Sequence, residues 1–260
     1  MARARAALLY LVLASAPAWA DVTVTYTTTG KGLMGMAGTF ETTTSIKGHK
    51  MRSEATVGGD PVITILDADT QQMISINPKK KEAEIIDLVK LNAEMAEKVG
   101  TAEAQVSVTP NGETRQVLGQ SCAGYTVRIT MPMNMAQGMS MTMQMGGPMF
   151  LAAGAPGSAD FSAFYRAAAE RGLVFTSAQQ AEAQPVQAKG MAEMYRAIAD
   201  LDGIPYEQEI DISMQGAGPM AAMMSRMGGA SMTITATAVS TDALSDDLFT
   251  IPAEFKVKNR

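Results

Sequence analysis

The methionine thioethers are the most unusual chemical groups in this sequence of 260 residues. It contains 22 Met but only 7 Phe, 6 Tyr and 1 Trp. Every second residue is Met in the run Met139, Met141, Met143 and Met145, and side chains at this spacing project from one face of a strand. A second group lies within residues 220–232. Soft thioether sulphur binds Cu(I) or Ag(I) without deprotonation, so several of these side chains could hold one such ion.

The same run also suits an apolar surface that adapts its shape. Met is unbranched and flexible, and it fills irregular gaps in cores and lines grooves that accept varied ligands. Because Met packs far more often than it binds metal, we interpret the run first as an apolar lining. The alternative is a Cu(I) or Ag(I) site at Met139, Met141, Met143 and Met145. Cu(II) would prefer imidazole ligands, and His49 is the only histidine.

A single thiol and a single imidazole leave little catalytic chemistry to Cys and His. Cys122 alone builds neither a zinc cluster nor a disulfide framework. A Cys122–His49 dyad would lack a third, orienting group, so we interpret Cys122 as a structural thiol. Glu207, Glu209 and Asp211 share one face of a strand and are interpreted as its solvated side rather than as a cation site. We therefore predict a protein that is not an enzyme and needs no cofactor.

The overall composition indicates a folded protein that does not bind nucleic acid. Hydrophobic residues make up 47% of the chain and charged residues 18%, which is enough apolar material for a core. The formal net charge is -5, whereas a nucleic-acid-binding protein needs a basic stripe.

The first twenty residues have the pattern of a cleaved secretory signal peptide. Arg3 and Arg5 precede a short apolar run, and residues 18–20 read Ala-Trp-Ala before Asp21. The apolar run is shorter than the roughly 20 residues that span a bilayer, and no later stretch is long enough either. We predict a periplasmic protein in which residues 21–260 form a single domain without a membrane span.

Period-two alternation predicts short strands along most of the chain. Strong alternation, with apolar residues on one face and polar residues on the other, is typical of an antiparallel sheet with one covered face. The predicted strands begin at Val22 and also cover residues 39–47, 50–57, 62–66, 72–76, 82–86, 113–133, 139–145, 206–214 and 232–238.

Three amphipathic helices interrupt these strands. Apolar residues from Leu88 to Val99 recur at helical spacing behind an Asp87 cap. Phe161, Phe164 and Tyr165 follow a proposed Ser158 cap, and residues 191–198 repeat the spacing. Residues 177–190 are interpreted as a loop or a frayed helix, and residues 146–148 as a turn. The fold class is α+β, with helices packed on the apolar face of a large antiparallel sheet.

Several short segments, in a fixed order, resemble an uncharacterised family of exported proteins with the lipoprotein-carrier (LolA/LolB-like) fold. The similar motifs are a strand–turn–strand with an Asn-Pro exit, a Leu-Gly-x-x-Cys-x-x-Tyr strand entry, a Gly-x-Pro entry and a closing Phe-x-Ile-Pro. They lie at Ile65–Asp67 with Met73–Pro78, at Leu118–Tyr125, at Gly203–Pro205 and at Leu244–Pro252.

This resemblance implies a curved, half-open barrel whose concave apolar face is covered by helices and encloses a hydrophobic cavity. It also implies a hydrophobic small molecule or an acyl chain as the ligand. The leading hypothesis is therefore an exported binding protein for such a ligand, with Cu(I) or Ag(I) binding and a protein-interaction module as alternatives. The candidate lining residues are Tyr125, Val127, Ile129, Met141, Met143, Phe161, Phe164, Met191 and Tyr195.

Overall fold

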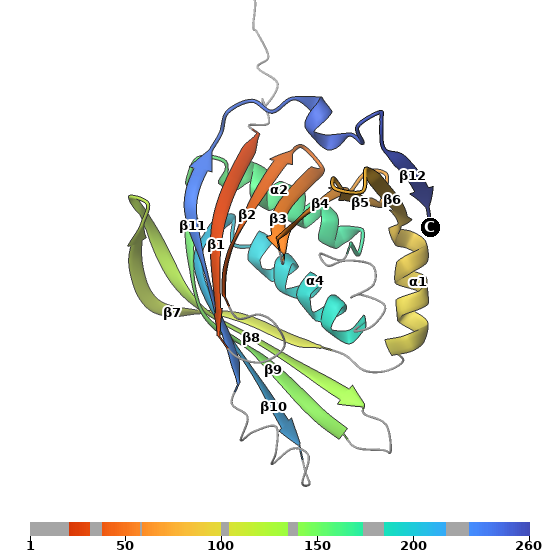
Figure 1. The fold of residues 1–260 in the computed structure, drawn as a ribbon. Coiled ribbons are helices and arrows are strands. Elements are labelled where there is room, and N and C mark those ends of the chain that lie inside the picture. The colour runs from red at the N-terminus through yellow and green to blue at the C-terminus, as the bar shows by residue number, and fades with distance from the viewer. Residues whose placement is uncertain are drawn as a thin grey trace, which may run out of the picture.

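One twelve-stranded sheet contains every strand of the computed structural model, which describes residues 21–31, 38–57, 59–99, 104–134, 140–173, 185–216 and 229–260. The strand order is β12-β6-β5-β4-β3-β2-β1-β11-β10-β9-β8-β7 (Figure 1). Neighbouring strands are antiparallel except for β12 and β6, and the sheet is open, with β12 and β7 at its edges. The predicted large antiparallel sheet is thus confirmed. Residues 1–20, predicted to be a signal peptide, lie outside the described residues.

The first half of the sheet is a meander of hairpins. Its strands are β1 (Val22–Lys31), β2 (Gly38–Lys47), β3 (Lys50–Val57), β4 (Asp60–Asp67), β5 (Gln72–Asn77) and β6 (Glu82–Asp87). Helix α1 (Leu88–Val99) follows directly. As predicted, Asp87 caps this helix, because its Oδ1 accepts hydrogen bonds from the backbone N–H groups of Val89 at 2.9 Å and Lys90 at 3.2 Å.

The second half of the sheet confirms strand structure over most of residues 113–133 and corrects one prediction. The strand region belongs to β7 (Gln105–Val117) and β8 (Gln120–Asn134), which are separated by a turn in which Leu118 and Gly119 both have positive φ. Residues 146–148 are not a turn, because β9 (Ser140–Ala153) continues through them. Glycine is needed there for close approach, since a Cβ at Gly146 would lie 2.1 Å from the carbonyl oxygen of Val127.

Two helices pack on one face of this sheet. Helix α2 (Ser158–Glu170) contacts β10 and β2, and α4 (Pro185–Ala199) contacts β7 and β8. The proposed Ser158 cap is wrong: the N-cap is Gly157 in a left-handed conformation, and Ser158 is the first helical residue. Of residues 177–190, predicted as a loop or a frayed helix, residues 185–190 are helical and the others lie outside the described residues. The chain returns to the sheet in β10 (Gly203–Gly216) and β11 (Ala230–Ser240), and β11 pairs with β1.

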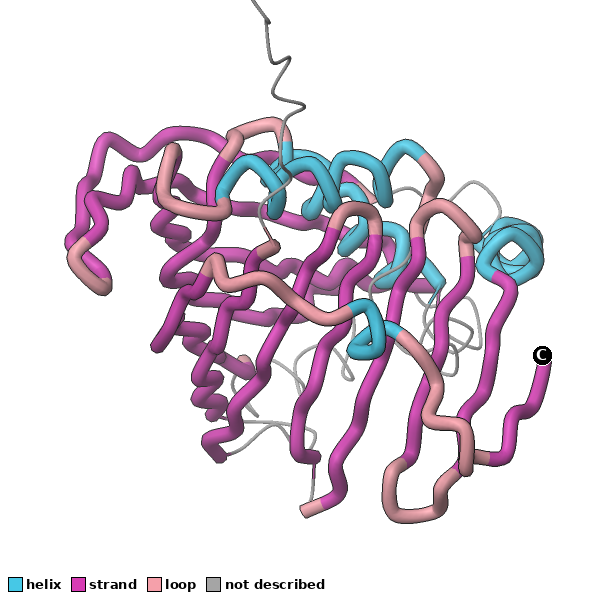
Figure 2. Tube along the Cα trace, turned by 90° about the horizontal axis from the view of Figure 1, so that it is seen from above, coloured by secondary structure: helices cyan, strands magenta, loops and turns pink. Residues whose placement is uncertain are grey.

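The opposite face of β3–β6 is also covered, which the predicted single covered face did not include. Residues 241–255, the C-terminal strap, cross these strands and contain a short 3-10 helix, η2 (Asp246–Phe249), before β12 (Lys256–Asn259) (Figure 2). Lys47 Nζ donates to Leu244 O at 2.6 Å, and an Arg52 guanidinium N–H donates to Leu248 O at 2.9 Å. Phe249 of the strap packs in a buried cluster with Ile65 of β4 and neighbouring strand residues.

Candidate binding site

The two helices over the sheet are fixed to each other at their C-terminal ends. Arg166 of α2 donates a hydrogen bond to the carbonyl oxygen of Ala199 at 3.1 Å, near the end of α4. Arg196 of α4 donates in return to the carbonyl oxygen of Ala169 at 3.0 Å, near the end of α2. Each guanidinium therefore adds a hydrogen bond to a C-terminal carbonyl that also accepts one from a backbone N–H just beyond its helix, that of Gly172 for Ala169 and that of Asp202 for Ala199. This exchange orients the apolar sides of both helices toward the same sheet face.

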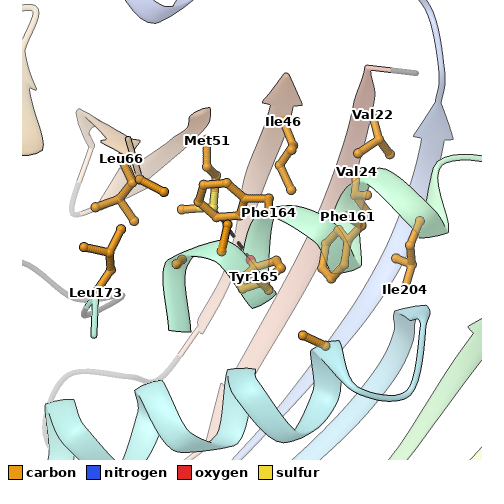
Figure 3. Packing of buried hydrophobic residues seen from close by; sticks show 14 of the residues in the cluster. Val22, Val24, Ile46, Met51, Leu66, Phe161, Phe164, Tyr165, Leu173 and Ile204 are labelled. Carbon is orange, nitrogen blue, oxygen red and sulfur yellow. Dashed lines mark hydrogen bonds between the residues drawn. The ribbon is translucent and has the colours of Figure 1, made fainter. Parts of the chain in front are cut away.

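Helix α2 brings an aromatic group onto the first half of the sheet. Figure 3 shows Phe161, Phe164 and Tyr165 beside the strand residues Val24, Ile46 and Met51. The spacing of the three aromatic residues places them on one helical face, as predicted, and all three are buried. The Tyr165 hydroxyl donates to the Met51 sulphur at 3.7 Å. Together with Tyr195 of α4, whose ring stacks on Tyr165 at 4.9 Å between centroids, they form the aromatic cluster.

Methionine side chains of α4 and of the second half of the sheet pack together with other apolar residues. Met131, Met143 and Met214 are register partners on β8, β9 and β10, so their side chains form a row on one sheet face. Five buried and three half-buried methionines belong to the same packed group, the methionine cluster. Its members are Met131, Met143, Met145, Met149 and Met194, with Met191, Met214 and Met232 half-buried.

A glycine in α4 allows the helix to lie close to this row. A Cβ at Gly190 would be 3.1 Å from the Met131 sulphur and 3.4 Å from Cγ2 of Ile129. The helix backbone therefore sits almost directly on the side chains of β8. Gln208 of β10 lies under the same helix, and its side-chain N–H group donates to the Met194 sulphur at 3.9 Å.

The structure divides the predicted lining residues between two adjoining clusters. Phe161 and Phe164 belong to the aromatic cluster, whereas Val127, Ile129 and Met143 are buried in the methionine cluster. Tyr195 packs against both and joins them. Tyr125 and Met191 are half-buried at the margin of the methionine cluster.

Some predicted residues stand apart from this arrangement, and others were missed. Met141 is 4% exposed but belongs to neither cluster, and Met139 lies outside the described residues. Met149, Met194 and Met214 were not among the predicted lining residues although they join the methionine cluster. Alternation through β9 would have placed Met149 on the inner face, had the Gly-Gly-Pro segment been interpreted as strand, and alternation through residues 206–214 already placed Met214 on the apolar face.

Burial of the tyrosines favours their neutral form. Burial raises the pKa of Tyr165 well above its usual value, and the nearby phenols of Tyr195 and Tyr26 raise it further. Burial also raises the pKa values of Tyr26 and Tyr195. A charged phenolate would be poorly solvated there, so the centre of the helix–sheet interface is an apolar environment.

Cys122 and His49 lie far apart in the sheet. Cys122 in β8 is fully buried, its thiol donates weakly to the carbonyl oxygen of Gln120 at 3.6 Å, and burial raises its pKa. His49 lies in the β2–β3 turn, with Nδ1 2.8 Å from an Asp69 carboxylate oxygen. Four strands of the sheet lie between β2 and β8. Cys122 therefore has the environment of an inert structural thiol.

Two hollows have residues of the methionine cluster, or residues packed against it, in their walls. One is a groove of about 450 Å³ between the start of β7 and α4. The other is a depression of about 400 Å³ over β8, β9 and β10, with Gly146, Gly147 and Arg128 among its lining residues. In the described part of the chain, no three His, Cys, Asp or Glu side chains are placed to hold a metal ion, and no helix is long and apolar enough to cross a membrane.

Sequence comparison gives a family for part of the chain. Residues 31–148 match DUF4412, a domain of unknown function. The predicted resemblance to an uncharacterised family is therefore confirmed over that region. The DUF4412 region ends within β9, so it includes β8 but neither α2 nor α4. No curated protein matches the sequence.

Two solved structures are similar to this chain over most of its length. An uncharacterized conserved protein from Thermus thermophilus has a TM-score of 0.42 at 8% identity, covering 94% of this chain and 92% of the other. A LolA superfamily protein from Nitrosomonas europaea has a TM-score of 0.30 at 7% identity, covering 90% of this chain and 91% of the other.

Proposed function

We propose that this protein is an exported, periplasmic carrier that binds a hydrophobic small molecule or an acyl chain between α4 and the sheet. The methionine cluster is the observation that carries the proposal. Eight flexible thioether side chains, six from the sheet and two from α4, form an interior that can rearrange around an inserted chain. The helices and strands act as the two walls of a half-open barrel, with the helices on its concave face.

Binding rather than catalysis is the activity that this interior supports. Its groups are apolar side chains and neutral phenols, and a carrier needs no nucleophile, acid or base. The aromatic cluster, with α2 held by Phe161 and Phe164, forms the firm end of the interface. The methionine cluster forms the adaptable end, and Tyr195 lies between them.

A photoreactive fatty acid tests the location of the ligand directly. We expect a diazirine-bearing palmitate to bind the purified protein and, on irradiation, to label peptides containing Met143, Met194 or Tyr195. Lipids that copurify with the protein should compete with the probe. Labelling confined to other surfaces, or no saturable binding, would refute the proposed site.

Cu(I) or Ag(I) binding is the second candidate, because thioethers from four strands (β8, β9, β10 and β11) and from α4 belong to one packed cluster. Changing Met131, Met143, Met145 and Met194 together to Leu separates the two functions. Leu preserves apolarity and near volume at about 1.5 kcal/mol or less per site, but it removes the sulphur. The fatty-acid proposal requires that the variant still bind the probe. Tight anaerobic Cu(I) uptake by the unchanged protein that disappears in the variant, without probe binding by either, would favour the metal.

A further inference from the structure

The outer edge of β7 is a strand edge without a described partner. No described strand pairs with β7 on the side away from β8. Its second half carries features that discourage pairing, namely Pro110 and a register irregularity between Pro110 and Thr114. The first half, Gln105–Thr109, has the sequence Gln-Val-Ser-Val-Thr, with neither proline nor charge. This segment, which we call the open edge, retains free backbone groups for another strand.

A regular row of charges on α4 lies beside the open edge. Lys189, Glu193, Arg196 and Asp200 line the groove of about 450 Å³, together with Ala104 and Val106 of the β7 side. The four charged residues are spaced i, i+4, i+7 and i+11, which places them on one side of the helix. Their signs alternate as positive, negative, positive, negative. We call this row the charge stripe.

The sign pattern of the charge stripe is complementary to itself when reversed. In an antiparallel arrangement of two copies, Lys189 of one faces Asp200 of the other. Glu193 of one also faces Arg196 of the other, in addition to the ion pair that these two residues form within each chain at 3.5 Å. In a parallel arrangement, like charges would face each other. A two-fold axis therefore converts the charge stripe into four opposite-charge pairs, which is the geometry of an isologous interface.

The open edge and the charge stripe share one centre. Gly190, next to Lys189, approaches Ala104 so closely that a Cβ there would be 3.0 Å from the Ala104 Cβ. From Lys189 to Asp200 the helix advances about 16 Å, and a strand covers the same length in about five residues. The middle of the charge stripe thus lies near Ser107, the middle of the open edge. One axis can serve both.

We propose that two copies of this chain pair through this surface. The open edges join as antiparallel strands around Ser107, so that the two sheets continue into each other, and the two charge stripes face across the junction. The interface uses the edge of β7 and the charge stripe rather than the methionine cluster, so dimerisation and ligand binding can be tested independently. Its occupant is a second copy rather than an unrelated peptide because the charge stripe is complementary to its own reverse.

A charge-swap cycle followed by sedimentation equilibrium tests the interface. We expect the unchanged protein to be a dimer, and Lys189→Glu or Asp200→Lys alone to raise the dimer dissociation constant about tenfold, because two like-charge pairs arise in each dimer. The double variant should return toward the original value. Within one chain these residues lie about 16 Å apart, so restoration reports contact between copies. Lys90→Glu, on exposed α1, is the matched control and should change little.

Two further measurements make the outcome decisive. Added salt should weaken the dimer, since exposed ion pairs are screened. Backbone amides within Gln105–Thr109 should exchange more slowly with solvent as protein concentration rises. A chain that stays monomeric up to its solubility limit overturns the proposal. So does a dimer in which the double swap restores nothing or in which these amides gain no protection.

Discussion

Replacement of Phe164 by Ala should be among the most damaging single changes in the helix layer. The ring is 0% exposed and packs edge-on against Tyr165, with centroids 5.3 Å apart and ring planes at 79°. A buried Phe→Ala change costs about 3–5 kcal/mol, and loss of an edge-on aromatic pair adds roughly 0.5–1.5 kcal/mol beyond buried area. We therefore expect a loss of about 4–5 kcal/mol in the free energy of unfolding.

Urea unfolding followed by circular dichroism measures this loss. For a chain of this size, about 4–5 kcal/mol corresponds to a fall in Tm of roughly 8–20 °C. Phe40→Ala is the matched control, because Phe40 lies on β2 with 40% of its surface exposed and should change stability by no more than about 0.5 kcal/mol. A loss below about 1 kcal/mol at Phe164, with an unchanged urea dependence, would show that α2 does not pack on the sheet as described.

Three other perturbations test separate parts of the fold. Gly146→Ala should lower the free energy of unfolding by more than about 2 kcal/mol, because a φ of 152° is strained for Ala and the new Cβ would meet the Val127 carbonyl. The control Gly154→Ala, whose Cβ meets nothing within 4 Å, should cost about 1–2 kcal/mol for its left-handed conformation alone, and equal urea midpoints for the two variants would contradict this. Burial raises the folded-state pKa of Tyr165, so the contribution of this residue to the free energy of unfolding should be constant below the unfolded phenol pKa of about 10 and fall as pH rises above it. Tyr165→Phe should make the fall in stability with pH less steep in unfolding curves, and an unaltered pH dependence would contradict the burial. Deletion of residues 256–260 removes β12 and uncovers the edge of β6, so light scattering should show faster aggregation on heating, and an unchanged rate would argue that β12 does not protect this edge.

Local patterns predicted the helix faces well because those patterns follow from short-range geometry. The spacing of Phe161, Phe164 and Tyr165 placed all three against the sheet, and Asp87 was identified as a cap from its position before an apolar run. Neither conclusion depends on a distant part of the chain. Gly157 was not predicted as the N-cap of α2, because a glycine cap acts through its backbone conformation and has no side chain that would indicate it in the sequence.

Features that depend on distant segments could not be predicted in the same way. The Gly-Gly-Pro segment resembles a turn locally, and only the close approach of Val127 from another strand explains why β9 continues through it. Likewise, the motif ending in Pro252 gave no indication that the C-terminal strap covers β3–β6. For the candidate site, alternation gave the inner face of β8 and β9, but the division into two clusters joined by Tyr195 depends on where α4 crosses the sheet.

The pairing of β1 with β11 constrains how the molecule can fold. These strands sit side by side in the middle of the sheet, yet Thr23 pairs with Ser240 almost at the other end of the chain. Closing so long a loop is entropically costly and slows folding. Until β11 has emerged, β1–β6 and β7–β10 are separate sub-sheets with exposed edges at β1 and β10, which are open to wrong partners. The native sheet is therefore completed only when nearly the whole chain is present, so a chain lacking its last thirty or so residues should aggregate rather than fold partway.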